Sequence, residues 1–249
     1  MPNLELSSDE EDIKKKKKVA IKDTRDKFYK KAIVITSRVH PGETQSSFLV
    51  EGLINYLLSD EDEACEIRDK FVIKIIPMLN PDGVILGNSR SSLIGVDLNR
   101  RWIKPSKFLH PTVYYTKSLI KYLNKKLHQP EVKSGGVVLF TDIHGHNKNQ
   151  DIFMYGCVVE RDYAYHEGNM LIRSIPDGVD RIVPVFSSHK CKFAIETDKV
   201  ETGRIVVFRE FSILNSYTLE CSFHGSEHLQ RTKQIYMALY TQDYLQVLN

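Results

Sequence analysis

Two nearly continuous apolar runs follow one another in the first third of the chain. They are "KAIVITS" (31–37) and "FVIKIIPML" (71–79), and both are rich in valine and isoleucine. Runs of this kind are typical of strands that are covered on both faces. Between them, apolar side chains recur at helical spacing at Leu49, Leu53 and Leu57. The pattern predicts a strand, a helix and a second strand.

Further segments extend this pattern toward the carboxyl end. A helix is expected over 112–127, and "SGGVVLFTD" (134–142) and "DIFMYG" (151–156) read as strands. "RIVVF" (204–208) and "SYTLECSF" (216–223) are predicted as late strands. The order of elements predicts an α/β fold with a mixed, mostly parallel sheet and helices on both faces.

The first thirty residues differ from the rest in composition. "SSDEEDIKKKKK" places an acidic block before a lysine block and offers almost nothing to bury, which is typical of a disordered, solvated tail. The alternatives are a nuclear-import signal or a patch that binds polyanions. We therefore expect a charged tail over residues 1–30 and a single domain over residues 31–249.

Charge and composition narrow the class of partner. With 35 basic and 32 acidic residues, the net charge of +3 is too small to indicate nucleic acid. No apolar stretch approaches the ~20 residues that a membrane-spanning helix needs. The 4 cysteines form no CxxC pair and no signal peptide precedes them. A reduced, soluble protein of the cytoplasm is expected, with no nucleic acid or membrane as partner.

Polar residues follow the first predicted strand directly. In "HPGE", His40 and Glu43 stand three apart, and Gly42 allows the backbone to fold back. Function gathers at the carboxyl ends of strands in open α/β sheets, and a His and a Glu at this spacing can reach one cation. The alternative is an ordinary turn with a hydrogen-bonded histidine.

The segment "FTDIHGHN" offers a third metal ligand. Asp142, His144 and His146 alternate along this strand and share one face of it. A catalytic zinc takes three protein ligands, often two His and one Glu, and leaves its fourth position to water. His40, Glu43 and one of the two histidines would supply this set.

Three further segments carry polar residues of catalytic type. Arg90 lies in "GNSRSS", and Asp97, Asn99 and Arg100 lie in "GVDLNRRW". The planar fork of arginine matches a carboxylate, so this region could hold an anionic substrate end; a solvated loop with surface salt bridges is the alternative. Glu220 stands among apolar residues of "SYTLECSF", where it either faces solvent or acts as a general base in a water-poor cleft.

Taken together, these segments resemble the zinc carboxypeptidases, specifically the cytosolic carboxypeptidase branch. The resemblance covers roughly residues 31–228 and rests on blocks in the same order and approximate spacing. They are "SRVHPGET", "IIPMLNPDGVILGNSR", "GVDLNRRW", "DIHGHN", "IFMYGC", "ETGR" and "NSYTLECSFHGS". The resemblance implies a zinc carboxypeptidase-like fold, a catalytic domain over residues 31–249 and one zinc ion per chain.

The resemblance also implies a role for each residue around the metal. His40, Glu43 and His144 correspond to the zinc ligands. Asp97 corresponds to the carboxylate that orients the first histidine. Glu220 corresponds to the general base and acid.

For the substrate, the resemblance implies four further roles. Asn99 and Arg100 correspond to the pair that grips the terminal carboxylate, and Arg90 to the arginine that polarises the scissile carbonyl. Arg204 resembles the arginine of the side-chain pocket, where a basic residue would pair with a glutamate side chain. Its alternative is a surface arginine at a strand edge.

The branch resembled here acts on acidic tails, notably polyglutamate chains on tubulin. This implies a metallocarboxypeptidase that removes C-terminal glutamate from acidic protein tails, in the cytoplasm and at microtubules or cilia. Two alternatives remain. One is a small-molecule zinc amidohydrolase of the aspartoacylase type, which shares the fold and the His, Glu, His ligands. The other is a catalytically silent fragment that binds tails.

Both ends of the chain depart from the family pattern. Family members usually carry a β-rich domain and early sheet strands where this chain has only its charged tail. The closing "DYLQVLN" resembles the opening of the family's final helix. We therefore expect a form truncated at both ends, with an exposed sheet edge and exposed apolar surface.

Overall fold

A computed structural model describes residues 30–127, 136–158 and 167–227. The predicted tail, apart from Lys30, and the segment "DYLQVLN" lie outside the described residues. The strands are β1 (Lys31–Ser37), β2 (Phe71–Ile76), β3 (Val137–His146), β4 (Ile152–Tyr155) and β5 (Ser216–Ser222). The helices are α2 (Gln45–Leu57), α3 (Asp62–Lys70), α4 (Pro81–Ile85), α5 (Pro111–Leu127), α6 (Glu167–Ile182) and α7 (Gly203–Phe211). Single 3₁₀ turns are η1 (Leu98–Arg100), η2 (Ser188–Lys190) and η3 (Thr197–Lys199).

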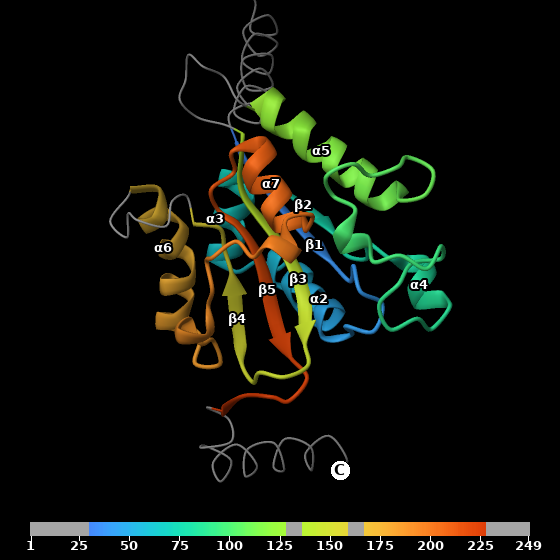
Figure 1. Cartoon of the computed structure of the whole chain (residues 1–249). Coiled ribbons are helices and arrows are strands. Elements are labelled where there is room, and N and C mark those ends of the chain that lie inside the picture. Colours follow the sequence, from blue (N-terminus) through green and yellow to red (C-terminus); the bar gives the residue numbers. More distant parts are fainter. Residues whose placement is uncertain (1–29, 128–135, 159–166, 228–249) are drawn as a thin grey trace, which may run out of the picture.

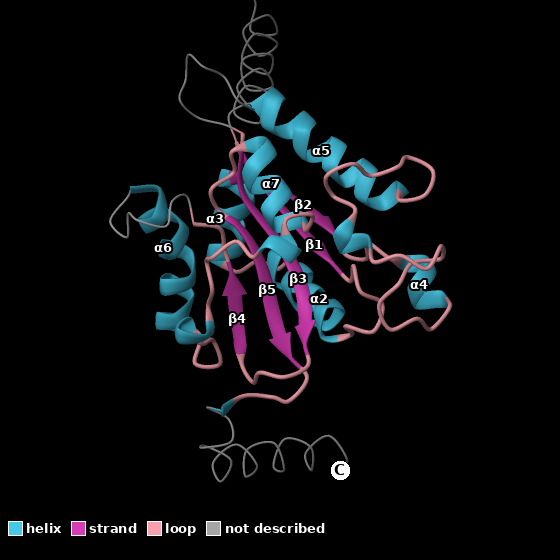
Figure 2. Ribbon diagram, viewed as in Figure 1, coloured by secondary structure: helices cyan, strands magenta, loops and turns pink. Residues whose placement is uncertain are grey.

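The strands form one sheet in the order β2-β1-β3-β5-β4 (Figure 1). β2, β1, β3 and β5 run parallel to one another, and β4 runs antiparallel to β5. The ribbon diagram shows helices in front of this sheet and behind it (Figure 2). The predicted fold class, a mixed and mostly parallel sheet with helices, is confirmed.

Alternation along β1 divides the core between the two faces of the sheet. Ala32 and Val34 pack in a cluster with residues of α5 and α7. Ile33 and Ile35 pack in a different cluster with residues of α2. Because both faces are covered, the run reads as continuously apolar, as the sequence indicated.

The predicted strand over residues 204–208 is wrong, because these residues form the first half of α7. Ile205, Val206 and Val207 are all buried there, so the segment has no polar face to reveal a helical period. A short apolar run cannot be assigned to helix or strand by periodicity alone. The β-branched residues of the run favoured the wrong choice.

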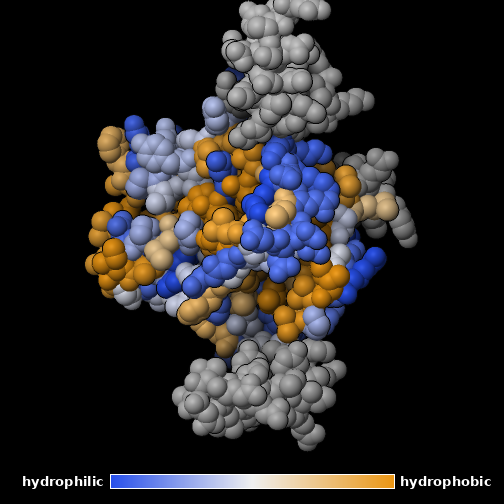
Figure 3. All heavy atoms as spheres, turned by 180° about the vertical axis from the view of Figure 1, so that it is seen from behind, coloured by the Kyte–Doolittle hydropathy of each residue, from blue (hydrophilic) through white to orange (hydrophobic). Residues whose placement is uncertain are grey.

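Apolar and strongly polar surface lie side by side on the back of the molecule (Figure 3). Within the described part of the chain, β2 ends the sheet and pairs only with β1. A groove of about 320 Å³ runs beside β2 and is lined by Ile54, Leu57, Leu58, Arg68, Phe71, Ile73 and Ile75. No helix among the described residues is long and apolar enough to cross a membrane.

Replacing Gly203 with alanine is expected to destabilise the fold by about 1–3 kcal/mol, the usual cost of overpacking. A Cβ on Gly203 would lie 2.8 Å from the Cε2 atom of Trp102, whose side chain is fully buried. Gly52 of α2 has open space at the same position, so Gly52→Ala should stabilise the fold by about 0.5–1 kcal/mol. Urea unfolding of the two variants measures both effects, and equal changes would contradict the packing argument.

Candidate active site

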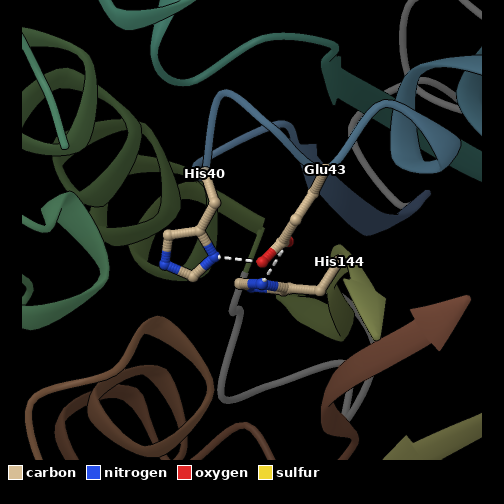
Figure 4. Close-up of side chains that lie close together, drawn as sticks. All are labelled: His40, Glu43 and His144. Atoms are coloured by element: carbon tan, nitrogen blue, oxygen red, sulfur yellow. Dashed lines mark hydrogen bonds and ion pairs between the residues drawn. The ribbon is translucent and has the colours of Figure 1, made fainter. Parts of the chain in front are cut away.

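Three side chains that could hold a metal ion meet at the carboxyl end of the sheet (Figure 4). His40 and Glu43 lie in the turn between β1 and α2, and His144 lies near the end of β3, the strand that pairs with β1. One ligand atom from each lies within 4.8 Å of the other two. The Nδ1 atoms of His40 and His144 lie 2.7 and 3.0 Å from the two carboxylate oxygens of Glu43. The structure therefore brings together the three predicted zinc ligands.

Close backbone contacts hold the turn that carries His40 and Glu43. The Gly42 amide donates to the carbonyl of Ser89 at 2.8 Å, and a Cβ on Gly42 would lie 2.8 Å from that same oxygen. The Gly145 amide donates to Glu43 Oε2 at 2.9 Å. The glycine of "HPGE" thus permits a close approach that a larger residue would block.

Each histidine of the cluster has a carboxylate behind it. His40 Nε2 lies 3.1 Å from Asp97 Oδ1, and His144 Nε2 lies 2.8 Å from Asp142 Oδ2. A histidine that binds metal typically donates its outer N–H to such a carboxylate, which leaves the other ring nitrogen for the ion. Two imidazole nitrogens and one carboxylate are a donor set suited to zinc.

Electrostatics keep the carboxylates of the cluster ionised. Burial alone would raise the pKa of Glu43, but attraction and hydrogen bonds from His144 and His40 outweigh it and hold this pKa well below its usual range. Asp97 follows the same pattern, with His40 and Arg90 lowering its pKa against the effect of burial. Metal ligands of this type must be deprotonated, so the cluster is prepared for a cation.

His146 lies outside the cluster although it shares a strand with His144. Its Nδ1 atom accepts hydrogen bonds from the backbone amides of Lys148 and Asn149, at 3.2 and 2.9 Å. Its ring packs edge to face on Phe153 with centroids 5.1 Å apart. His144 is therefore the histidine that the geometry joins to His40 and Glu43.

The cluster forms one wall of a cleft of about 730 Å³. Asp97 does not line the cleft, because it lies behind His40. The other eight predicted site residues all do, namely His40, Glu43, Arg90, Asn99, Arg100, His144, Arg204 and Glu220.

Glu220 stands next to His144, its register partner on the adjacent parallel strand. Burial is the largest influence on this carboxyl group and raises its pKa to about 7; attraction by His144 opposes the rise, and the nearby Glu43 carboxylate adds to it. A carboxyl group that titrates near neutral pH can both accept and release a proton.

A hydrogen-bond network around Asp97 fixes the loop that carries Arg90, Asn99 and Arg100. Arg90 contacts Asp97 Oδ2 through both Nε, at 2.9 Å, and Nη2, at 2.8 Å. The backbone amide of Asn99 donates to Asp97 Oδ1 at 2.8 Å. The side-chain oxygen of Asn99 accepts from the backbone amide of Gly203 at 3.0 Å. Arg100 Nη1 donates to the Asn99 carbonyl at 3.1 Å. Asp97 thus links His40 to the loop that carries both arginines.

Arg204 is buried in the first turn of α7, so its interpretation as a surface arginine at a strand edge is wrong. Its Nη1 atom donates to the carbonyl of Gly156, and its guanidinium carbon lies 5.9 Å from the centroid of the Tyr155 ring. The Nε atom is buried without a hydrogen-bond partner in the described part of the chain. A buried donor of this kind is costly unless a ligand satisfies it.

Sequence reasoning missed several residues of the site. Lys192 and Lys199 line the cleft from the irregular segment before α7, whose path no periodicity predicts. Tyr155 lines it from β4, and burial raises its pKa to about 12, so it stays protonated. The sequence placed Asp142 on the same strand face as His144, but the spacing did not predict which residues its carboxylate contacts.

Comparison with known proteins agrees with this geometry. A family model described as zinc carboxypeptidase matches residues 5–156, and the chain belongs to this family. The family uses zinc, which agrees with the candidate His-Glu-His site.

The similar proteins include cytosolic carboxypeptidases, as the sequence predicted. Mouse cytosolic carboxypeptidase 4 is 40% identical over 202 residues, which cover 77% of this chain and 17% of the relative. Cytosolic carboxypeptidase 1 of Xenopus laevis is 38% identical over 204 residues, with coverage of 78% and 16%. The chain therefore spans about a sixth of the length of these relatives. A metallo-carboxypeptidase structure from Burkholderia cenocepacia aligns with a TM-score of 0.65 and 27% identity, covering 78% of this chain and 48% of that one.

Proposed function

We propose that this chain is a zinc-dependent metallocarboxypeptidase that removes C-terminal glutamate from acidic protein tails. The observation that carries the proposal is the convergence of three elements in one cleft. A His-Glu-His cluster, a carboxyl group whose pKa burial raises to about 7 and three arginines all line it.

His40, Glu43 and His144 would hold the zinc ion, which supplies Lewis acidity and lowers the pKa of water at the site. Glu220 takes the proton of the attacking water and then delivers it to the leaving amine. Arg90 stabilises the negative charge that develops on the scissile carbonyl oxygen. Asp97 keeps His40 in the orientation that binds metal.

Asn99 and Arg100 restrict the reaction to chain ends by binding the terminal carboxylate of the substrate. Both belong to η1, and Asp97 and Gly203 hold Asn99 in place. Arginine binds a carboxylate with two parallel N–H donors, which adds geometric selectivity to the charge attraction. An internal peptide bond offers no such group, so the arrangement favours an exopeptidase.

The charge of the cleft supports an acidic substrate. Among the described residues that line it, five are cationic and three are carboxylic acids, and one of the acids is the proposed ligand Glu43. Arg204 belongs to this lining, and Lys192 and Lys199 add two further cations. A glutamate side chain would complement the positive charge of these groups, whereas an apolar side chain would not.

The resemblance extends the proposal to a partner and a location. Polyglutamate tails of tubulin are the substrate that we propose, in the cytoplasm at microtubules or cilia. The name cytosolic carboxypeptidase, carried by the similar mouse and frog proteins, supports the cytoplasmic location.

The test is release of free glutamate from a synthetic peptide that ends in several glutamates, by the purified 249-residue chain loaded with zinc. The matched control substrate is the same peptide with an amidated carboxyl end, which should be inert because Arg100 and Asn99 find no carboxylate. Hydrolysis of N-acyl amino acids but not of peptides would instead support the amidohydrolase. Stoichiometric binding without turnover would support the silent tail-binding fragment.

Arg204→Met is expected to reverse the side-chain preference. Loss of a charge-assisted hydrogen bond worth about 1.5–3 kcal/mol should lower kcat/KM for a terminal glutamate by roughly 10- to 150-fold. The value for a terminal leucine should hold or rise, because methionine keeps an unbranched apolar chain in the pocket. Arg204→Lys keeps the charge, so its kcat/KM for a terminal glutamate should fall between those of the wild type and Arg204→Met. An equal loss on both peptides would mean that Arg204 supports the fold and not the specificity.

A further inference from the structure

Asp142 is a fully buried carboxylate held at both oxygens. Asp142 and Thr36 are each 0% exposed, and they are register partners on the parallel strands β3 and β1. The Thr36 hydroxyl donates to Asp142 Oδ1 at 2.6 Å. The other oxygen, Oδ2, lies 2.8 Å from His144 Nε2. These two contacts fix the plane of the carboxylate group.

The two carboxylates behind the histidines differ in their surroundings. The side chain of Asp97 is 20% exposed and also pairs with Arg90. The side chain of Asp142 is 1% exposed, and among the described residues its one salt-bridge partner is His144. Burying a carboxylate is costly unless it is paired and hydrogen-bonded. The placement of Asp142 is therefore explained only by its partners, Thr36 and His144.

We propose that Asp142 is a positioning residue for the metal site and that Thr36 holds it in place. By accepting the Nε2–H of His144, Asp142 selects the ring tautomer whose Nδ1 lone pair points toward Glu43 and the metal position. The inference rests on the proposed zinc site and adds a second carboxylate–histidine pair to the predicted pair of Asp97 and His40. Neither residue lines the cleft.

Zinc affinity of the full chain, measured by competition with a chelator at constant pH, tests the inference. Asp142→Asn should raise the zinc Kd by about 10- to 100-fold, the range for outer partners of metal ligands. Thr36→Val should raise it by roughly tenfold, because Asp142 Oδ1 loses its hydroxyl donor. Thr36→Ser keeps the hydroxyl and should bind like the wild type. Ser37→Ala removes a neighbouring buried hydroxyl that has no hydrogen-bond partner among the described residues, and should also bind like the wild type.

A second readout separates positioning from a purely structural role. The Nε2–H resonance of His144 in ¹⁵N-labelled protein should be present in the wild type and Thr36→Ser, and displaced in Asp142→Asn. A purely structural role would lower the melting temperature of the zinc-free protein and leave both zinc affinity and this resonance unchanged. If Asp142→Asn does not fold, the Thr36→Val and Thr36→Ser pair decides the question.

The outcomes distinguish this inference from the proposed function. Zinc binding by the wild type with an unchanged Kd in folded Asp142→Asn or Thr36→Val would overturn the inference and leave the zinc site standing. Failure of the wild type to bind zinc would overturn both.

Discussion

Glu220→Gln is expected to lower kcat for glutamate release by about 10²–10⁴-fold, the usual contribution of a general acid–base group. Glutamine has the same shape but cannot take the proton from the attacking water. Glu220 does not belong to the ligand cluster among the described residues, so the variant should still take up zinc. The paired measurement is initial-rate kinetics and zinc content on the same preparation.

Glu196→Gln is the matched control for this variant. Glu196 lines the same cleft from the segment before η3, but it is neither the register partner of His144 nor a member of the metal cluster. Its replacement should leave kcat close to the wild-type value. Full activity in Glu220→Gln would show that the proton is carried by another group.

Glu220 also determines the expected pH dependence of the rate. Because burial raises the pKa of Glu220 to about 7, the zinc-free protein holds more of the protonated form as the pH falls below that value. A bound cation favours the carboxylate and lowers this pKa. The rate of the zinc-loaded enzyme should therefore fall toward acid pH along a limb that lies below pH 7. Glu220→Gln should lose this limb from its residual rate.

Nearly continuous apolar runs were sufficient to predict most of the sheet. β1 and the first half of β3 are nearly continuous apolar runs followed by polar residues, and parallel strands bring their carboxyl ends to one edge of the sheet. At this edge the structure places His40 beside His144, and His144 beside Glu220. The apolar runs therefore predicted the strands themselves.

What the sequence could not supply was contact between segments. The pairing of Thr36 with Asp142 depends on the register of β1 against β3, which two separate apolar runs leave undetermined. Arg204 and the three residues that follow it are all buried in α7, so the periodicity of this short run did not distinguish a helix from a strand. Lys192 and Lys199 come from irregular chain, and only the folded path shows that both line the cleft.

Alternation alone also left the choice between His144 and His146 open, and a pair of variants decides it in solution. His144→Ala removes one of the three proposed ligands and should weaken zinc binding by more than the roughly 10- to 100-fold that an outer partner contributes. Peptide hydrolysis by this variant should become undetectable. His146→Ala, two residues further along the same strand, should keep both zinc and activity, because the ring of His146 is engaged with the backbone of Lys148 and Asn149.

Thermal unfolding with and without zinc gives an independent measure for the same two variants. A ligand that binds only the folded state stabilises it by RT ln(1 + [L]/Kd), so zinc should raise the melting temperature of the wild type and of His146→Ala. His144→Ala should show no rise at the same zinc concentration. Its zinc-free form should also melt at a lower temperature than the wild type, because the buried Asp142 carboxylate keeps Thr36 but loses His144. A zinc-dependent rise in His144→Ala together with its loss in His146→Ala would move the third ligand to His146 and contradict the geometry of the cluster.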